Sequence, residues 1–314
     1  MSESYRKINY NLRPSKHMER KMICEALRRL AAFGRVETYR YIGFGALYFS
    51  DFVLFHKSLG MRHMISVEHE KKNEESFEFN KPYDCITIKY GESNDILPQL
   101  PWDVRTVLWL DYDGRLDESV LRDIEYFANH GMPGSVIIVT VNAHPDPKDS
   151  DPIKTLREAV SGRKVVPSHL RKEDLQSWGL ARVCAGIIRN DILEVLFDRS
   201  APRQAGSKFC YKQLFNFHYS DGARMLTTGG IIYDEGQSGI VDGCSFDSLP
   251  FVVVGDDAFR IEVPKLTYRE ILYLDSQLPC ADVDQLETFG IPRGDVESYR
   301  QLYRYFPRFA EAEF

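Results

Sequence analysis

The sequence predicts an α/β fold, a doubly wound and mostly parallel sheet that ends in an antiparallel hairpin. Three observations predict it. Short segments that are apolar on both faces alternate with helical segments over residues 39–141. A glycine-rich turn follows the first of these strands, and an acidic residue ends the second. Later in the chain, Ser220-Asp221-Gly222 joins two strand-like runs, and an Asp-Gly turn in that setting is typical of a β-hairpin.

The predicted strands and helices follow one another closely along the chain. We expect five parallel strands at residues 39–43, 63–68, 85–90, 106–110 and 135–141. The hairpin is expected at residues 208–219 and 224–233, which gives a seven-stranded sheet. Helices are expected at residues 48–59, 71–80 and 117–129. Because the strands are apolar on both faces, we expect helices to cover both sides of the sheet.

Two extensions flank this sheet domain, which we place at residues 38–236. Residues 1–37 form a basic extension with a helix at residues 15–33. Its charge favours contact with an anionic substrate, with RNA or with the acidic end of the chain, unless it is simply a solvated helix face. Residues 237–314 form an acidic α+β extension. Within it we expect a strand at residues 251–254 and helices at residues 268–274 and 296–305.

An insertion at residues 144–207 separates the fifth strand from the hairpin. It begins with a segment rich in proline and aspartate, and we expect a helix at residues 181–197. The insertion is longer than an ordinary connection, and long segments beside the carboxyl edge of a sheet often form lids or substrate pockets. We therefore expect it to determine substrate specificity.

The composition is that of an ordinary globular chain. Of its 314 residues, 43% are hydrophobic and 27% charged, and the net charge is −6. No apolar run approaches the roughly 20 residues that span a bilayer, so we expect no membrane partner. The six cysteines include no Cys-x-x-Cys pair, which argues against structural zinc and disulfides. We expect a cytoplasmic protein.

A nucleoside-binding cradle is predicted where the first two strands end. Gly43-Phe44-Gly45 lets the backbone approach a ligand closely at the start of a helix. Glu68 ends the second strand, where a carboxylate can accept hydrogen bonds from two ribose hydroxyls. Taken alone, the glycines could also form only a tight turn. Together with Glu68, they favour contact with a cofactor.

Two carboxylates follow the fourth strand. Asp111 and Asp113 lie at the edge where open parallel sheets bind ligands. They could accept a proton from a substrate, hold a divalent ion together with Asn142, or bind the cofactor and stabilise the loop. We expect a polar loop without a metal. His144, just after the fifth strand, is a further candidate for a general base.

This order of elements resembles that of class I S-adenosylmethionine-dependent methyltransferases, over about residues 38–235. The resemblance implies a Rossmann-like sheet with Gly43, Phe44 and Gly45 in the cofactor loop and Glu68 on the ribose. It also implies that Glu92 and the residue after it, Ser93, lie against the adenine. Asp111-Tyr112-Asp113-Gly114 matches the motif that lines the methyl-transfer site, so Asp111 is also expected to contact the cofactor.

The sequence departs from the family pattern at two positions of the cofactor loop. Tyr41 stands where many members carry an acid, and Leu47 replaces the third glycine. The methionine carboxylate of the cofactor could instead be held by the basic N-terminal helix, through Arg13, Lys16 or His17.

The resemblance implies transfer of a methyl group from S-adenosylmethionine to an oxygen or nitrogen atom of a small molecule, protein or RNA. The whole chain also resembles sequences described as putative O-methyltransferases. Two alternatives stay open: an NAD(P)-dependent oxidoreductase, and a cofactor-binding or catalytically degenerate partner protein. A C-terminal aromatic run favours packing in the core or in a homodimer contact over base stacking: Tyr299, Tyr303, Tyr305 and Phe306.

Overall fold

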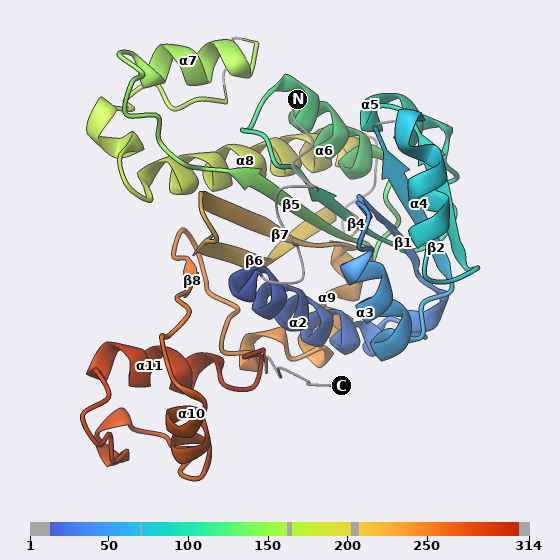
Figure 1. Ribbon diagram of the computed structural model, residues 1–314. Helices are drawn as coiled ribbons and strands as arrows, with labels where there is room; N and C mark the ends of the chain where they lie inside the picture. The colour runs from blue at the N-terminus through green and yellow to red at the C-terminus, as the bar shows by residue number, and fades with distance from the viewer. Residues whose placement is uncertain (1–12, 70, 162–164, 202–206, 308–314) are drawn as a thin grey trace.

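The computed structural model describes residues 13–69, 71–161, 165–201 and 207–307. Its centre is an eight-stranded sheet in the order β3-β2-β1-β4-β5-β7-β6-β8 (Figure 1). Strands β1 to β5 are parallel, and β7 pairs antiparallel with both β5 and β6. The predicted α/β class, with five parallel strands and an antiparallel hairpin, is confirmed.

Each predicted strand of the parallel sheet and of the hairpin begins and ends within one residue of its expected position. The strands are β1 (Arg40–Gly43), β2 (His63–Glu68), β3 (Ile86–Tyr90), β4 (Thr106–Asp111), β5 (Val136–Asn142), β6 (Phe209–Ser220), β7 (Arg224–Asp234) and β8 (Phe259–Ile261). The eighth strand was not expected. It pairs parallel to β6 at the edge of the sheet.

The strand expected at residues 251–254 is wrong. This apolar run is not part of the sheet; Phe251 is buried in the core, whereas Val254 is 84% exposed. The chain pairs with the sheet only further on, at β8, where Phe259 lies beside Phe217. A β-branched composition marked this run as a strand, but strand formation also needs a free sheet edge at the right place.

Helices cover both faces of the sheet. They are α2 (Pro14–Arg28), α3 (Ser50–Leu59), α4 (Glu74–Asn80), α5 (Ser93–Ile96), α6 (Glu118–His130), α7 (Pro152–Ala159), α8 (Gly179–Ser200), α9 (Ser238–Gly243), α10 (Tyr268–Asp275) and α11 (Arg293–Leu302). None of the helices in the described part of the chain is long and apolar enough to cross a membrane.

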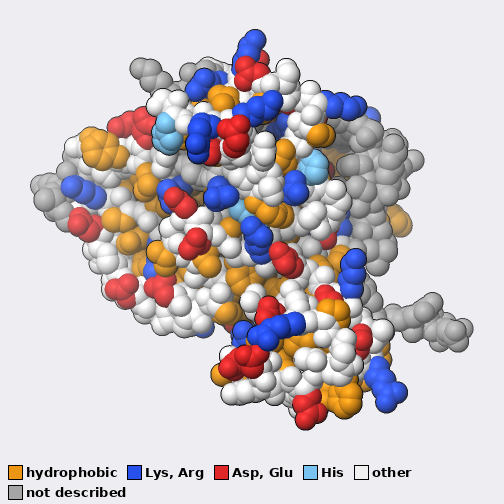
Figure 2. Space-filling view, turned by 90° about the vertical axis from the view of Figure 1, so that its left-hand side faces the viewer, with side chains coloured by type: hydrophobic (Ala, Val, Ile, Leu, Met, Phe, Trp, Pro, Cys, Tyr) orange, Lys and Arg blue, Asp and Glu red, His pale blue; other side chains and the backbone are white. Residues whose placement is uncertain are grey.

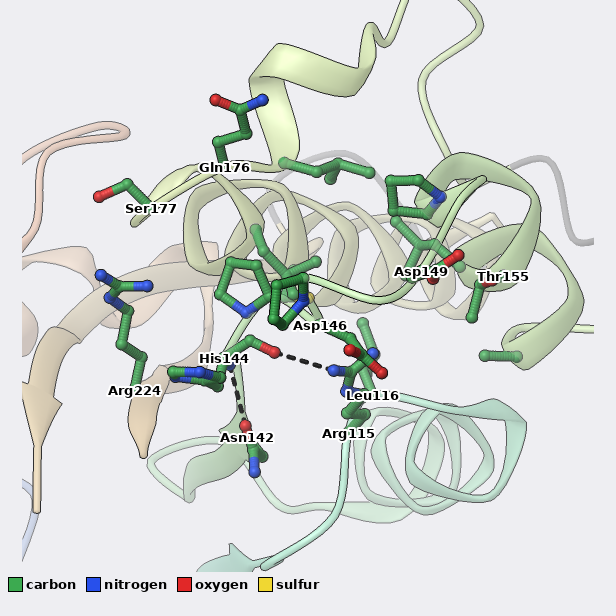
Figure 3. A pocket seen from close by; sticks show the side chains of 18 of the residues that line it. Arg115, Leu116, Asn142, His144, Asp146, Asp149, Thr155, Gln176, Ser177 and Arg224 are labelled. Carbon is green, nitrogen blue, oxygen red and sulfur yellow. Dashed lines mark hydrogen bonds between the residues drawn. The ribbon is translucent and has the colours of Figure 1, made fainter. Parts of the chain in front are cut away.

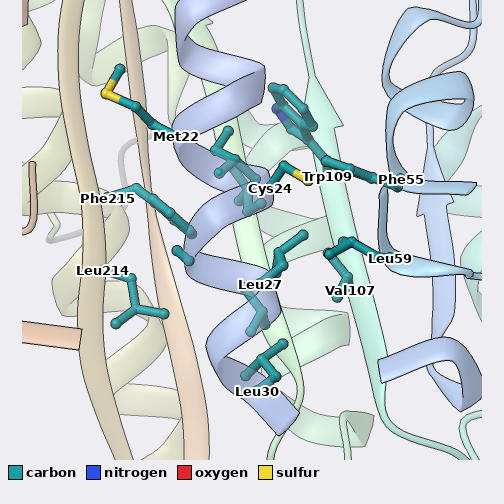
Figure 4. Close-up of a cluster of buried hydrophobic side chains, with 14 of the residues drawn as sticks. Met22, Cys24, Leu27, Leu30, Phe55, Leu59, Val107, Trp109, Leu214 and Phe215 are labelled. Atoms are coloured by element: carbon teal, nitrogen blue, oxygen red, sulfur yellow. The ribbon is translucent and has the colours of Figure 1, made fainter. Parts of the chain in front are cut away.

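Helix α2 packs in the core on one face of the sheet. Leu27 of α2 and Leu30, in the turn that follows α2, lie against Val107 of β4 and Leu59 of α3 (Figure 4). The strand residues alternate, so that Leu108, next to Val107, belongs to the core on the opposite face, under α6 and α8. The N-terminal helix is therefore an integral part of the core. Of its basic run, Lys16 and Arg20 are buried, whereas Arg28 and Arg35 are exposed, so the interpretation as a solvated face holds for only part of the run.

The C-terminal helices α10 and α11 enclose a small hydrophobic cluster of their own, centred on Leu274, Val296 and Tyr299. On the face that carries these helices, acidic and basic side chains are interspersed (Figure 2). The segment after α11 is tied to α2 through Glu25, which accepts hydrogen bonds from Arg304, at 2.9 Å, and from the Tyr305 hydroxyl. In this contact the acidic residue lies on α2 and the basic residue in the C-terminal extension. The net charges of the two segments, basic for residues 1–37 and acidic for residues 237–314, suggest the opposite arrangement.

Candidate active site at the carboxyl edge of the sheet

Three candidate residues end neighbouring parallel strands at one edge of the sheet. Gly43 ends β1, Glu68 ends β2 and Asp111 ends β4. Strand β1 lies between the other two, and the order of the strands reverses there along the chain. Such a reversal is where open α/β sheets place their ligands. The loop after β1 consequently passes between two carboxylates.

The glycine loop is closed over Glu68. The amide of Gly45 donates to Oε1 of Glu68 and to Oγ of Ser66, each at 2.9 Å. A Cβ atom on Gly45 would lie 2.6 Å from both the Phe49 ring and Ser66 Oγ, so only glycine fits. Ala46 and Phe49 have φ angles of 47° and 45°. Left-handed backbone at non-glycine residues is strained and is found at functional sites.

Glu68 is an unusual carboxylate. Its side chain is buried, with 6% of the residue exposed. Burial raises the pKa of Glu68 to about 7, although hydrogen bonds from Ser66, Gly45 and Ala46 partly oppose the shift. The acid therefore changes charge near neutral pH, at the carboxyl end of β2.

Lys16 brings a buried positive charge to Asp111. Its Nζ lies 2.6 Å from Asp111 Oδ1, 2.8 Å from Glu19 Oε2 and 3.2 Å from the Tyr219 hydroxyl. Burial alone would lower the pKa of Lys16, but the carboxylates of Asp111 and Glu19 outweigh it and raise this pKa. Burial raises the pKa of Glu19. Lys16 thus stays charged and fixes one oxygen of Asp111.

The hairpin turn helps to hold Lys16 in place. Helix α2 has no side-chain cap from its own N-cap residue, Arg13. Instead the amide of Lys16 donates to Asp221 Oδ2 at 3.1 Å, so an acid of the turn between β6 and β7 accepts from the first turn of α2. A carboxylate there satisfies a free amide and matches the helix dipole.

A cavity of about 140 Å³ lies between the loop and these carboxylates. It is lined by Arg20, Phe44, Gly45, Ala46, Tyr48, Ser50, Asp51, Glu68, Asp111 and Asp113. The structure therefore brings Phe44, Gly45, Glu68, Asp111 and Asp113 together, as expected from the sequence.

Sequence analysis missed the two other charged residues of this cavity, Arg20 and Asp51. Arg20 lies one helical turn after Lys16, and this spacing was a usable signal because residues four apart share a helix face. Asp51, at the start of α3, accepts a hydrogen bond from the Tyr41 hydroxyl. An acid therefore does reach the base of the glycine loop, from α3 instead of β1.

The remaining candidates lie outside this cavity. Glu92 is exposed and lies 2.6 Å from His69 Nδ1, while Ser93 Oγ lies 3.2 Å from the Tyr112 hydroxyl. Gly43 does not line the cavity, and a Cβ atom on it would meet the Tyr41 side chain. Within the described ranges, no group of three or more His, Cys, Asp or Glu residues could hold a metal ion.

His144 lines a second cavity, of about 460 Å³, beneath the insertion (Figure 3). Its amide donates to Asn142 Oδ1, and its carbonyl accepts from Arg115, both at 2.9 Å. The two cavities are linked along the chain, because Asp113 lines the first and Arg115 the second. Between them, the amide of Asn142 donates to the carbonyl of Gly114 at 2.8 Å.

Comparison with known proteins gave one family and several solved structures. Residues 8–314 match the model of the family described as "Putative O-methyltransferase". No curated protein matches the sequence. An O-methyltransferase from Bacillus cereus in complex with SAH is 16% identical, with 67% of this chain and 80% of that chain covered and a TM-score of 0.36.

Two other solved structures are similar to this chain. TomG, an O-methyltransferase from Streptomyces achromogenes in complex with SAM, is 16% identical, covers 67% of this chain and 79% of its own, and has a TM-score of 0.36. Trm1 from Pyrococcus horikoshii, in complex with S-adenosyl-L-methionine, is 11% identical and has a TM-score of 0.46. The match covers 71% of this chain and 57% of the Trm1 chain. The family match, which spans nearly the whole sequence, confirms the resemblance seen in the motifs, and this chain belongs to the putative O-methyltransferase family.

Proposed function

We propose that this protein transfers a methyl group from S-adenosylmethionine to an oxygen or nitrogen nucleophile. The observation that carries the proposal is the arrangement of Glu68, the Gly45 amide and Arg20 around one cavity at the strand-order reversal, in a chain of the O-methyltransferase family. Glu68 would accept hydrogen bonds from the ribose, and Arg20 would hold the carboxylate of the methionine moiety.

The chemistry of these groups fits the cofactor, but the volume requires the loop to move. Ligand pockets usually measure about 300–1,000 Å³, and this cavity measures about 140 Å³. The hydrogen bond from Gly45 to Glu68 closes it. We infer that cofactor binding opens this bond and that ribose hydroxyls replace the amide as donors to Glu68. The strained angles at Ala46 and Phe49 make such a rearrangement less costly.

The protein's own part in the reaction is orientation. The cofactor, when bound, supplies an activated methyl group on its sulfonium sulfur. In this proposal Asp111 or Asp113 accepts a hydrogen bond from the nucleophile and orients it, and Lys16 holds the carboxylate of Asp111 in place. His144, beyond the Gly114 contact, is the candidate base for an acceptor that must lose a proton. Orientation of this kind can contribute roughly 7–11 kcal/mol.

Isothermal titration calorimetry with S-adenosylmethionine and S-adenosylhomocysteine tests the proposal. The wild type should bind both, and Glu68→Ala should lower the affinity at least tenfold. Glu75→Ala, at an exposed acid of α4 outside the cavity, is the matched control and should bind like the wild type. Binding of a nicotinamide nucleotide alone would favour the oxidoreductase alternative. Binding of neither class would favour a degenerate partner protein.

A further inference from the structure

The cavity beneath the insertion combines an apolar wall with cationic side chains. Apolar side chains from the loops after β4 and β5, from α7, from the turn at Lys172–Leu175 and from α8 form its wall: Leu116, Pro145, Pro152, Leu156, Leu175 and Leu180. Three cationic side chains line it as well: Arg115, Lys172 and Arg224. With a volume of about 460 Å³, it falls within the range of about 300–1,000 Å³ that is usual for small-molecule sites.

Backbone carbonyls and an aromatic ring contact the cations of this cavity. Arg115 donates to the carbonyl of His144 at 2.9 Å, and Lys172 donates to the carbonyl of Ser150 at 3.2 Å. Arg224 lies over the Trp178 ring, 5.6 Å from its centroid. In the described part of the chain, none of the three cations forms an ion pair with a carboxylate.

The two acids that line the cavity are engaged with the backbone. Asp146 Oδ1 accepts from the amide of Lys148 at 2.9 Å, and Asp149 Oδ1 accepts from the amide of Asp151 at 3.0 Å. These contacts are local turns of the loop, which side chains of this type form within two residues of themselves. The two aspartates therefore stabilise turns of the loop and do not pair directly with the cations of the cavity.

Arg224 is held beside the candidate base. Its carbonyl accepts a hydrogen bond from the amide of Ala143 at 2.9 Å, so the backbones that carry Arg224 and His144 run side by side. Both side chains line the same end of the cavity, near Asn142 (Figure 3). A guanidinium held over an aromatic ring has restricted freedom, and its planar fork of donors suits a carboxylate.

We propose that this cavity binds the methyl acceptor, and that the acceptor is an anion with an apolar body and a carboxylate held by Arg224. This inference rests on the methyltransferase function proposed above. The apolar wall would bury the body of the acceptor, and Arg224, with Arg115, would neutralise its charge. The acceptor would then lie between His144 and the loop of Asp113.

The test is a comparison of two ligands of nearly equal shape, a hydroxynaphthoate and its neutral amide, titrated by calorimetry into the full chain. We expect the acid to bind at least tenfold more tightly than the amide, and acetate, which has the charge without the body, at least tenfold more weakly than the acid. Arg224→Met should reduce the preference for the acid to less than threefold. Arg157→Met, at an exposed arginine of α7 that does not line the cavity, should leave the preference unchanged.

Several results would overturn this inference: an amide that binds as tightly as the acid, an acid that does not bind, or a preference that survives Arg224→Met. Inorganic phosphate that competes as well as the hydroxynaphthoate would also overturn it, because it would indicate a simple anion site. Titration with S-adenosylhomocysteine in the same samples tests the proposed function separately. A preserved acid preference without cofactor binding would support the anion site and contradict the methyltransferase function.

Discussion

Replacing Lys16 by methionine tests how the N-terminal helix supports the candidate site. Methionine keeps most of the length of the side chain and its contact with the Trp109 ring, over which Nζ lies 4.8 Å from the centroid. It removes the cation that pairs with Glu19 and Asp111 at 2.8 Å and 2.6 Å. The substitution therefore isolates the charge from the packing.

The expected loss of stability is large because the pair is buried. The side chains of Lys16 and Glu19 are 5% and 0% exposed, so Lys16→Met leaves Glu19 as a buried carboxylate without its counterion. Breaking a buried pair in this way costs about 3–5 kcal/mol, a large part of the roughly 5–15 kcal/mol that stabilises a typical domain. Asp111, with 32% of its side chain exposed, adds less because solvent screens it.

Urea denaturation of the wild type and Lys16→Met at pH 8 and pH 5 measures this loss. Burial already raises the pKa of Glu19 in the folded protein, so its ionisation opposes folding above its usual value of 4.5. Without Lys16, an ionised Glu19 destabilises the folded protein further. The loss in free energy of unfolding caused by Lys16→Met should therefore be largest at pH 8 and should shrink as the pH falls toward 4.5. A second substitution in the Lys16→Met variant, Glu19→Gln, should restore most of the lost stability.

An exposed ion pair provides the control. Lys154 and Glu158 of α7 lie 3.7 Å apart and are 69% and 68% exposed. Lys154→Met should change the free energy of unfolding by less than about 1 kcal/mol. A Lys16→Met variant that unfolds within 1 kcal/mol of the wild type at pH 8 would show that the buried network does not support the site as argued.

Three further substitutions have defined outcomes. Because the pKa of Glu68 is raised to about 7, its ionisation opposes folding increasingly from pH 4.5 to pH 7. In urea titrations, the free energy of unfolding of Glu68→Gln should therefore rise relative to that of the wild type by up to roughly 3 kcal/mol between pH 4.5 and pH 8. A difference in stability that does not change with pH would contradict the assignment. Gly45→Ala should lose about 1–3 kcal/mol by the same measurement, since its Cβ meets Phe49 and Ser66 at 2.6 Å. Gly186→Ala, with nothing within 4 Å in the interior of α8, should instead gain about 0.5–1 kcal/mol.

The parallel sheet could be predicted from the sequence because its signals are local. Apolar runs, glycine turns and the Asp221-Gly222 turn each act over a few residues, and the strands therefore fell within one residue of their expected ends. Strand β8 has only three residues, and it exists because the chain returns to the free edge of β6. Nothing local in residues 259–261 indicates that long-range pairing.

The candidate site could be predicted only in part, for a similar reason. Glu68, Asp111 and Asp113 follow predicted strands, so their meeting at one edge follows from parallel topology. Arg20 reaches the same edge because α2 lies across the sheet and its hairpin, with Asp221 accepting from the start of the helix. The position of His144 in a separate cavity depends on how the insertion folds over β5, which no spacing in the sequence determines.

A crystal structure of the chain with S-adenosylhomocysteine tests the central claim most directly. The account predicts ribose hydroxyls within hydrogen-bond distance of the Glu68 carboxylate, with the bond from the Gly45 amide to Glu68 broken and the loop displaced. A nucleoside bound elsewhere, with the Gly45–Glu68 hydrogen bond intact, would contradict it.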